Sequence, residues 1–399
     1  MNTLKITNHK EIKKLTMLFM FTYMVSYITR INYGAIISEM EQATSFSKSM
    51  LSMALTGSFI TYGAGQIVSG ICGDKFSPKK LVSMGLCATV LMNLLIPLSN
   101  NPYQMTAVWC ANGFAQAFMW PPIVKLMTTL LADEDYKKAT VTISFGSSFG
   151  TIAVYLLSPM FILGFGWKSV FLFSGVCGLV MIVIWNRCCK DIAPTKKSKV
   201  RSAARPKYSM LFTPHMLCIM AAIVLQGMLR DGVTTWMPSY ISETYALGSA
   251  ISILTGVVLP VFSIVCFRIS SVLYRKVFIN PLVCAGVIFA AGTIAATLLL
   301  FLSGQHAAFS VVFSALLTGC MHGVNLMLIC MIPPNFEKHG NVSTVSGVLN
   351  SCTYVGSALS TYGIALISEQ YGWNTTIFIW ILIALFGTLL CFISSGKEL

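Results

Sequence analysis

The chain has 399 residues, of which 55% are hydrophobic and only 10% are charged. Soluble domains carry about 25% charged residues, so this composition excludes an ordinary soluble protein and indicates one embedded in a lipid bilayer. The net charge of +14 does not indicate nucleic-acid binding. The basic residues lie between apolar segments, as the positive-inside rule predicts for cytoplasmic loops.

Residues 1–14 are polar and basic but lead into a full-length apolar segment without a small-residue cleavage site. We therefore expect no removable signal peptide. The 13 cysteines lie mostly inside apolar segments and show no metal-ligand spacing. We expect reduced thiols, no metal and no cofactor.

Apolar segments of about 20 residues, the length that crosses a bilayer, recur along the whole chain. Twelve such segments predict an all-α integral membrane fold with both termini on the same side. We place them at 14–37, 50–73, 79–99, 103–131, 138–162, 166–187, 212–241, 249–272, 277–302, 307–332, 342–368 and 373–395.

Basic residues are concentrated on one side of this topology, and the opposite loops contain only Lys48 and Lys168. We therefore expect a multi-pass protein of the cell (inner or plasma) membrane with both termini cytoplasmic. The expected cytoplasmic side contains Lys5, Lys10, Lys13, Lys14, Lys75, Lys79, Lys80, Lys137, Lys138, Arg275, Lys276 and Lys338.

The longest loop, 188–211, is strongly basic and separates an N-terminal half, 1–187, from a C-terminal half, 212–399. We interpret it as a linker kept cytoplasmic by its charge, although such a cluster also attracts anionic lipid headgroups.

The two halves share an internal repeat. A Thr-Val pair, a glycine and a Gly-Trp pair follow in the same order, with sixteen residues from the glycine to Gly-Trp in both halves. Two related six-helix halves are typical of transporters that bind substrate near the middle of the membrane. The repeated residues are Thr140, Val141, Gly150, Gly166 and Trp167, and then Thr344, Val345, Gly356, Gly372 and Trp373.

Two arginines lie inside apolar segments, Arg30 in the first half and Arg230 in the second. A charge at that depth costs at least about 2.5 kcal/mol, so we interpret both as substrate-binding residues. Tyr23, Tyr27 and Arg30 have i, i+4, i+7 spacing and are expected to share one helical face. Guanidinium and phenol groups donate hydrogen bonds, so this face suits an oxyanion.

Acidic residues are scarce: the chain has 13, and Asp231 is the one clearly placed within a span. Consecutive helical residues point about 100° apart, so we expect Asp231 not to face Arg230. Both arginines would then lack protein counter-ions and bind a substrate anion. Asp231 is also a candidate proton-coupling group.

Further polar side chains are candidates for the same cavity. In span four Asn112, Gln116 and Trp120 share a face, and Pro121-Pro122 should kink the helix. Lys125 either attracts the anion or snorkels to the surface, and His322 is either a packing residue or a substrate or proton ligand. The remaining substrate-binding candidates are Tyr62, Gln66, Asn325, Asn350 and Tyr354.

The loop after span two, Gly70 to Lys80, has a glycine, an acid followed by a base, and a basic pair. We predict that Asp74, Lys75, Lys79 and Lys80 form a cytoplasmic latch that closes in one conformation. The corresponding segment after span eight has Ser270 and Ser271 in place of an acid.

These motifs resemble the organophosphate:phosphate antiporter family of the major facilitator superfamily. The resemblance implies twelve transmembrane helices in two pseudo-symmetric six-helix halves, rocker-switch exchange, and phosphate bound by two arginines at the domain interface. It extends over nearly the whole chain and is sharpest at Tyr23, Tyr27, Arg30, Asn32, Tyr62, Gly63, Trp120, Pro121, Pro122, Lys125, Leu229, Arg230, Trp236, Tyr240, Tyr354, Val355 and Gly356.

Departures from that pattern leave the substrate open. Gln66 stands where glycerol-3-phosphate exchangers have lysine, Ser147 lies near their histidine, and His322 replaces a cavity tyrosine. Lys125 stands at a position that is usually arginine. A sister family of anion:cation symporters also has an arginine in span one, but Arg230 favours the phosphate group.

Exchange of an organophosphate of the sugar or glycerol phosphate type for inorganic phosphate is the leading prediction. The alternatives are a proton- or sodium-coupled symporter of a carboxylate or hexuronate-like anion, using Asp231 or His322, and a transporter-shaped sensor. No nucleophile–base pair points to an enzyme. The expected partners are a small anionic substrate and the lipid bilayer, with no nucleic acid, and a monomer suffices.

Overall fold

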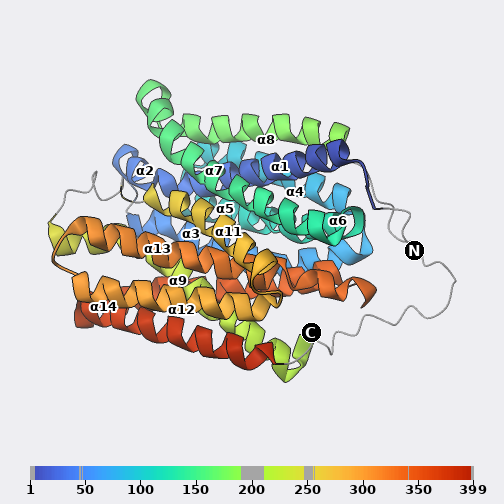
Figure 1. Cartoon of the computed structure of the whole chain (residues 1–399). Helices are drawn as coiled ribbons and strands as arrows, with labels where there is room; N and C mark the ends of the chain where they lie inside the picture. The colour runs from blue at the N-terminus through green and yellow to red at the C-terminus, as the bar shows by residue number, and fades with distance from the viewer. Residues whose placement is uncertain are drawn as a thin grey trace. The chain divides into compact units, whose positions relative to one another are not determined.

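The computed structural model describes residues 5–44, 46, 48–189, 211–246, 255, 257–339 and 341–396. Within these ranges the regular elements are all helices (Figure 1). They are α1 (His9–Ala35), α2 (Ile37–Ala43), α3 (Lys48–Lys75), α4 (Pro78–Leu95), η1 (Ile96–Leu98), α5 (Pro102–Gln116), α6 (Trp120–Leu130), α7 (Asp133–Phe165), α8 (Lys168–Cys188), α9 (Pro214–Tyr245), α11 (Val258–Lys276), α12 (Pro281–Leu302), α13 (Ala307–Asn325), η3 (Leu326–Cys330), η4 (Pro333–His339) and α14 (Val342–Ser395).

Each of the twelve predicted spans overlaps a helix in the described part of the chain. Eight helices there are long and apolar enough, by length and composition, to cross a membrane. Helices α1 and α3 are not among the eight, because polar side chains such as Arg30 and Gln66 lower their mean hydropathy. Most of the predicted linker, and the start of the span predicted at 249–272, lie outside the described residues.

Two places show where the chain bends within a predicted or observed element. The spans predicted at 342–368 and 373–395 are two helical segments of α14 that meet at a kink at Gly372, which has the non-helical angles φ 77° and ψ 173°. The span predicted at 103–131 is divided into α5 and α6 by a tight turn, and α6 begins with proline in its first turn. The predicted kink at Pro121–Pro122 is confirmed, because prolines have no N–H to continue the α5 hydrogen-bond ladder.

Four helices begin with the same local chemistry. A polar side chain accepts a hydrogen bond from a backbone N–H of the first turn, and the next residue is proline, which suits the first helical position. These starts are Ser77-Pro78 of α4, Asn101-Pro102 of α5, Thr213-Pro214 of α9 and Asn280-Pro281 of α12.

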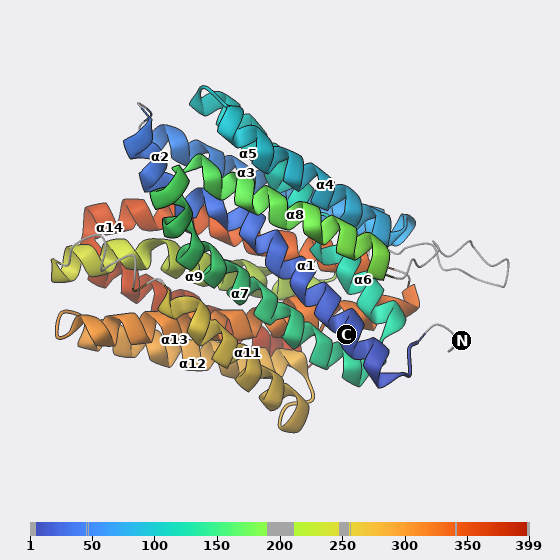
Figure 2. The same ribbon diagram turned by 90° about the horizontal axis from the view of Figure 1, so that it is seen from above.

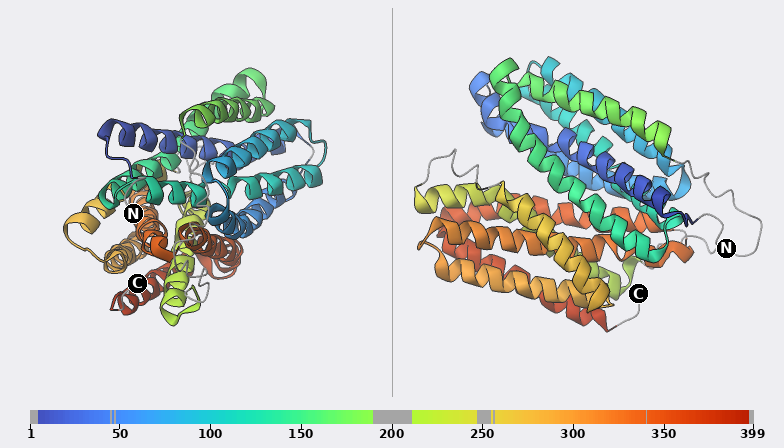
Figure 3. Two further views of the ribbon diagram at one scale, coloured as in Figure 1. Left: turned by 90° about the vertical axis from the view of Figure 1, so that its right-hand side faces the viewer. Right: turned by 45° about the horizontal axis from the view of Figure 1, so that its top comes forward.

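The helices form two compact units. Unit 1 is Met1–Lys207 with Pro333–Ser351, and unit 2 is Tyr208–Ile332 with Cys352–Leu399, so α14 passes from the first into the second. In unit 1, α1 packs along α7 and α3 along α5, and the right view of Figure 3 shows its blue-to-green helices side by side. In unit 2, α13 packs against α11, α12 and α9. Figure 2 shows α11, α12 and α13 as a group.

A close helix contact is repeated in the two units. A Cβ added to Gly150 on α7 would lie 2.5 Å from the carbonyl oxygen of Met24 on α1. A Cβ added to Gly356 on α14 would meet the carbonyl oxygen of Val224 on α9. Met24 and Val224 each precede the arginine of their helix by six residues. The repeat found in the sequence therefore marks a place where each arginine-bearing helix is closely packed against a neighbouring helix.

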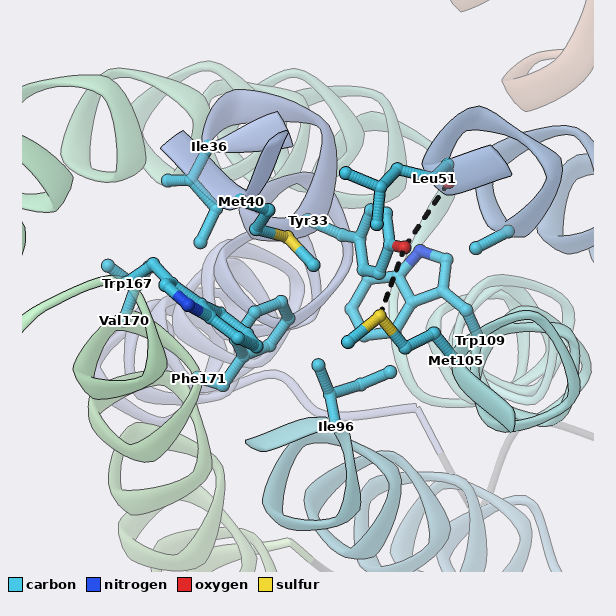
Figure 4. Close-up of a cluster of buried hydrophobic side chains, with 11 residues drawn as sticks. Tyr33, Ile36, Met40, Leu51, Ile96, Met105, Trp109, Trp167, Val170 and Phe171 are labelled. Carbon is cyan, nitrogen blue, oxygen red and sulfur yellow. Dashed lines mark hydrogen bonds between the residues drawn. The ribbon is translucent and has the colours of Figure 1, made fainter. Parts of the chain in front are cut away.

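Beyond Arg30, α1 is anchored by an apolar cluster of unit 1 (Figure 4). The ring of Tyr33 lies 5.0 Å from that of Trp109 and 5.9 Å from that of Phe171. Its hydroxyl donates to the Leu51 carbonyl at 3.2 Å and to the Met105 sulfur at 3.9 Å. The C-terminal part of α1 is therefore fixed to α3, α5 and α8.

The glycine contacts predict a specific loss of stability. Gly356→Ala places a methyl group against the backbone of α9, which cannot move aside, and overpacking of this kind costs about 1–3 kcal/mol. Gly363, on the same helix, has nothing within 4 Å of an added Cβ, so Gly363→Ala should leave the melting temperature unchanged or higher. Thermal unfolding of the purified variants measures both, and equal shifts would contradict the packing argument. Gly150→Ala and Gly164→Ala provide the same comparison on α7.

Candidate functional site

Arg30 is half-buried on α1 and lies between two tyrosine rings. Its guanidinium carbon is 4.2 Å from the ring centroid of Tyr27 and 4.7 Å from that of Tyr62 on α3. Aromatic faces attract cations electrostatically, more strongly where water is excluded. The two rings therefore stabilise the arginine charge.

The aromatic surface beside Arg30 continues away from the guanidinium. The ring of Tyr23 lies 5.1 Å from that of Tyr27 and 5.1 Å from that of Trp120 at the start of α6. The predicted shared face of Tyr23, Tyr27 and Arg30 is confirmed by these contacts. Two phenol rings thus contact the guanidinium, and a third phenol and an indole extend the same cluster, which contains several hydrogen-bond donors.

The residue before Arg30 is held by buried amides from two neighbouring helices. The Thr29 carbonyl accepts from Asn93 Nδ2 of α4 at 3.0 Å and from Asn112 Nδ2 of α5 at 3.1 Å. The Thr29 hydroxyl accepts from Gln116 Nε2 at 2.8 Å, and Gln116 Oε1 accepts from Ser26 at 2.8 Å. These bonds fix the rotation of α1, and therefore the direction of the Arg30 side chain.

Sequence reasoning found Asn112 and Gln116 but expected them on a face with Trp120. It did not find Asn93 or the role of Thr29. A buried Asn or Gln in an apolar helix needs a hydrogen-bond partner, and that requirement is the signal that could have identified them as helix clamps.

Gln66 is fully buried on α3. Its Nε2 donates to the Ala117 carbonyl at 3.3 Å, within the turn between α5 and α6. The backbone carbonyl oxygen of Gln66 lies directly against Gly347 on α14. The structure therefore places Gln66 in the packing between helices of unit 1.

In unit 2, Arg230 on α9 is paired with its neighbour. Arg230 Nε lies 2.7 Å from Asp231 Oδ1, and Nη2 lies 2.9 Å from Asp231 Oδ2. The expectation that Asp231 does not face Arg230 is wrong, and so is the expectation that Arg230 lacks a protein counter-ion. The 100° separation applies to the Cα–Cβ directions, whereas the long arginine side chain curves back to its neighbour.

Two further side chains bind this ion pair. Arg230 Nη1 donates to Asn325 Oδ1 of α13 at 3.1 Å, and Ser357 of α14 donates to Asp231 Oδ2. The predicted candidates Arg230 and Asn325 are therefore in direct contact. Ser357 was not predicted; its position next to Gly356 of the repeat was the available signal.

His322, three residues before Asn325, is held by backbone and hydroxyl groups of unit 2. Its Nδ1 donates to the Thr318 carbonyl at 3.0 Å and lies 3.2 Å from the Ser263 hydroxyl of α11. Its ring stands edge-on to Phe267 at 5.6 Å. Asn350 and Tyr354 on α14 are both buried, the first in unit 1 and the second in unit 2.

The predicted latch residue Asp74 binds the beginning of α14 within unit 1. Asp74 Oδ1 accepts from the Ser343 N–H at 3.0 Å and Oδ2 from the Thr344 N–H at 2.7 Å. A carboxylate there satisfies two unpaired N–H groups and complements the positive end of the helix dipole. Lys125 Nζ lies 3.5 Å from Asp74 Oδ1, a contact that sequence reasoning did not anticipate.

The three lysines after Asp74 differ in their surroundings. Lys79 Nζ donates to the carbonyls of Asn186 and Cys189 at 2.9 and 2.7 Å, and so anchors the C-terminal end of α8. Lys75 and Lys80 are exposed. Within the described ranges, no group of three or more His, Cys, Asp or Glu side chains is arranged to hold a metal ion.

These features define a class of protein. Long apolar helices throughout, with an arginine held inside each of two helical units, describe a multi-pass α-helical membrane transporter. The Major Facilitator Superfamily pattern matches residues 19–361, and the chain belongs to this family of transporters.

Relatives of known name are distant. The chain is 22% identical to the membrane sensor protein UhpC of Salmonella typhimurium over 88% of this chain and 84% of that one. For UhpC of Escherichia coli the identity is 22%, over 56% of this chain and 55% of the relative. A probable hexose phosphate transport protein of Chlamydia muridarum is 26% identical over 40% of this chain and 35% of its own length. The match to that protein and to the Escherichia coli UhpC therefore spans less than two thirds of each relative.

Solved structures confirm the fold. The transporter FucP, crystallised in its outward conformation, superposes with a TM-score of 0.77 at 12% identity, over 96% of this chain and 99% of that one. The predicted all-α major facilitator fold is therefore confirmed.

The contacts of Asp74 predict a measurable coupling. Asp74→Asn removes the charge that pairs with Lys125 and caps α14, so we expect a loss of about 1–3 kcal/mol, as for a charged hydrogen-bond partner. Lys125→Gln should cost less in the Asp74→Asn background than alone, because the pair is already broken. Thermal unfolding of the two single variants and the double variant gives the coupling. The exposed Lys80→Gln is the control, and additive effects at Asp74 and Lys125 would contradict the ion pair.

Proposed function

We propose that the protein is a secondary active transporter that exchanges an organophosphate, of the sugar or glycerol phosphate type, for inorganic phosphate by alternating access. Arg30 and Arg230 hold the anion. The observation that carries the proposal is the Arg30 cluster, in which a guanidinium and several phenols meet at membrane depth.

The chemistry of unit 1 supports an oxyanion as the ligand. A guanidinium donates paired hydrogen bonds that match the spacing of phosphate or carboxylate oxygens. The hydroxyls of Tyr23, Tyr27 and Tyr62 add single donors. The clamp on Thr29 keeps the arginine in place before substrate binds, so that less ordering is needed on binding.

The relatives support a phosphorylated substrate. Chlamydial relatives carry the name of probable hexose phosphate transport proteins, and the motifs around both arginines resemble organophosphate:phosphate antiporters. Exchange follows from charge: a site that contains arginine charge switches its access from one side of the low-dielectric membrane to the other more readily when an anion is bound to it.

The proposed exchange mechanism also includes a membrane topology and a gate. We infer two six-helix halves, 1–187 and 212–399, joined by the basic segment 188–211, with both termini cytoplasmic. Asp74 and its basic neighbours act as the gating latch, and a monomer contains the whole site.

Two alternatives each rest on one observation. The Asp231 carboxylate beside Arg230 favours a proton- or sodium-coupled symporter of a carboxylate, which would show uptake driven by a pH or sodium gradient without internal phosphate. The name of a relative aligned over 88% of the chain, a membrane sensor, favours anion binding without transport.

Counterflow distinguishes these functions. Reconstituted vesicles loaded with phosphate should take up labelled phosphate, and Arg30→Lys or Arg230→Lys should lower the rate at least about tenfold, because lysine cannot replace a charge-assisted paired bond worth about 1.5–3 kcal/mol.

The exposed Arg187→Lys and Arg268→Lys are the matched controls, one in each unit, and should retain the full rate. Unimpaired counterflow in either the Arg30 or the Arg230 variant would overturn the proposed function. Anion binding without counterflow in the unaltered protein would support the sensor.

A further inference from the structure

Arg230 is already engaged by an anion that belongs to the protein. Its Nε and Nη2 groups, which form one edge of the guanidinium, both donate to the Asp231 carboxylate, at 2.7 and 2.9 Å. This is the same paired geometry in which a guanidinium binds a phosphate or carboxylate ligand. Asp231 therefore occupies one of the edges through which a guanidinium can bind an oxyanion in a paired manner.

The carboxylate is held in this position from a second helix. Ser357 on α14 donates to Asp231 Oδ2, while Asn325 on α13 accepts from Arg230 Nη1 at 3.1 Å. The arginine side chain retains only 12% of its exposed surface. The two opposite charges are fixed together, so the pair adds almost no net charge to this part of unit 2.

This arrangement differs from that of Arg30. The rings of Tyr27 and Tyr62 contact the Arg30 guanidinium, and rings carry no formal charge. An anion that binds Arg230 comes close to the Asp231 carboxylate, and like charges repel strongly where water is scarce. Each additional negative charge on the substrate increases this repulsion.

We propose that Asp231 is a built-in counter-ion of Arg230 and makes the transporter select singly charged oxyanions over doubly charged ones. Among the proposed substrates, this selects the protonated, singly charged form of a sugar or glycerol phosphate and of inorganic phosphate, and the same class includes phosphate diesters and monocarboxylates. This inference rests on the proposed function, because it requires Arg230 to contact the substrate.

A pair of probes that differ in charge tests the selection. At pH 8, dimethyl phosphate carries one negative charge, and methyl phosphate carries about two, because the second pKa of a phosphate monoester is about 6. Isothermal titration of the purified protein gives the ratio of the two affinities. The unaltered protein should favour dimethyl phosphate, and Asp231→Asn should shift the ratio towards methyl phosphate by about tenfold. Comparing ratios removes the difference in size between the probes.

Glu243→Gln is the matched control. Glu243 is an acid on the same helix whose carboxylate accepts from Trp373 Nε1 at 2.7 Å, so this variant removes the same charge without affecting Arg230 and should keep the original ratio. Ser357→Ala, which releases Asp231 from its fixed position, should shift the ratio in the same direction by about threefold. If Asp231→Asn fails to fold, the affinity ratio of Ser357→Ala tests the role of Asp231 in its place.

The outcomes separate the inference from the proposed function. An unchanged ratio in Asp231→Asn, or in Ser357→Ala where the first variant does not fold, overturns the inference. If Arg230→Lys binds both probes as tightly as the unaltered protein, Arg230 does not contact the anion. The proposed function and the inference then both fail.

Discussion

The structure depends on holding two arginine charges inside helices that cross a low-dielectric layer. A charge there is tolerated only where other groups replace its hydration. Unit 1 surrounds Arg30 with tyrosine rings and fixes its helix through the buried amides on Thr29. Unit 2 surrounds Arg230 with a carboxylate and an asparagine. The internal repeat places a glycine in close contact with both arginine-bearing helices. The side chains around the two arginines nevertheless differ.

Much of the fold follows from local sequence. Apolar length predicts the helices, and pairs such as Asn101-Pro102 mark where they begin. The i, i+4 spacing correctly grouped Tyr23, Tyr27 and Arg30, because side chains one turn apart must be neighbours. The same reasoning failed at Asp231, since spacing describes where side chains leave the helix and not where a long, flexible one ends. Asp74 presents a different limit: its partners Ser343 and Thr344 are far away in sequence, and no local pattern identifies them.

The hydrogen bonding of the buried amides could have been predicted in part from the sequence. Asn93, Asn112 and Gln116 lie in apolar helices where an unpaired amide is costly. Each had to bond another helix, and the residue before Arg30 receives bonds from all three. Which partner an amide chooses depends on the packing of three helices at once, so the clamp becomes visible only in three dimensions.

The pairing of Arg230 with Asp231 also bears on the response to voltage. Moving one elementary charge across a membrane potential of 100 mV involves about 2.3 kcal/mol. Because these two charges are opposite and in direct contact, they move as a neutral pair, and the potential does almost no net work on them wherever the pair travels. In the proposed exchange, the electrical component of the transport cycle would therefore depend on charges outside this pair, including that of the transported anion.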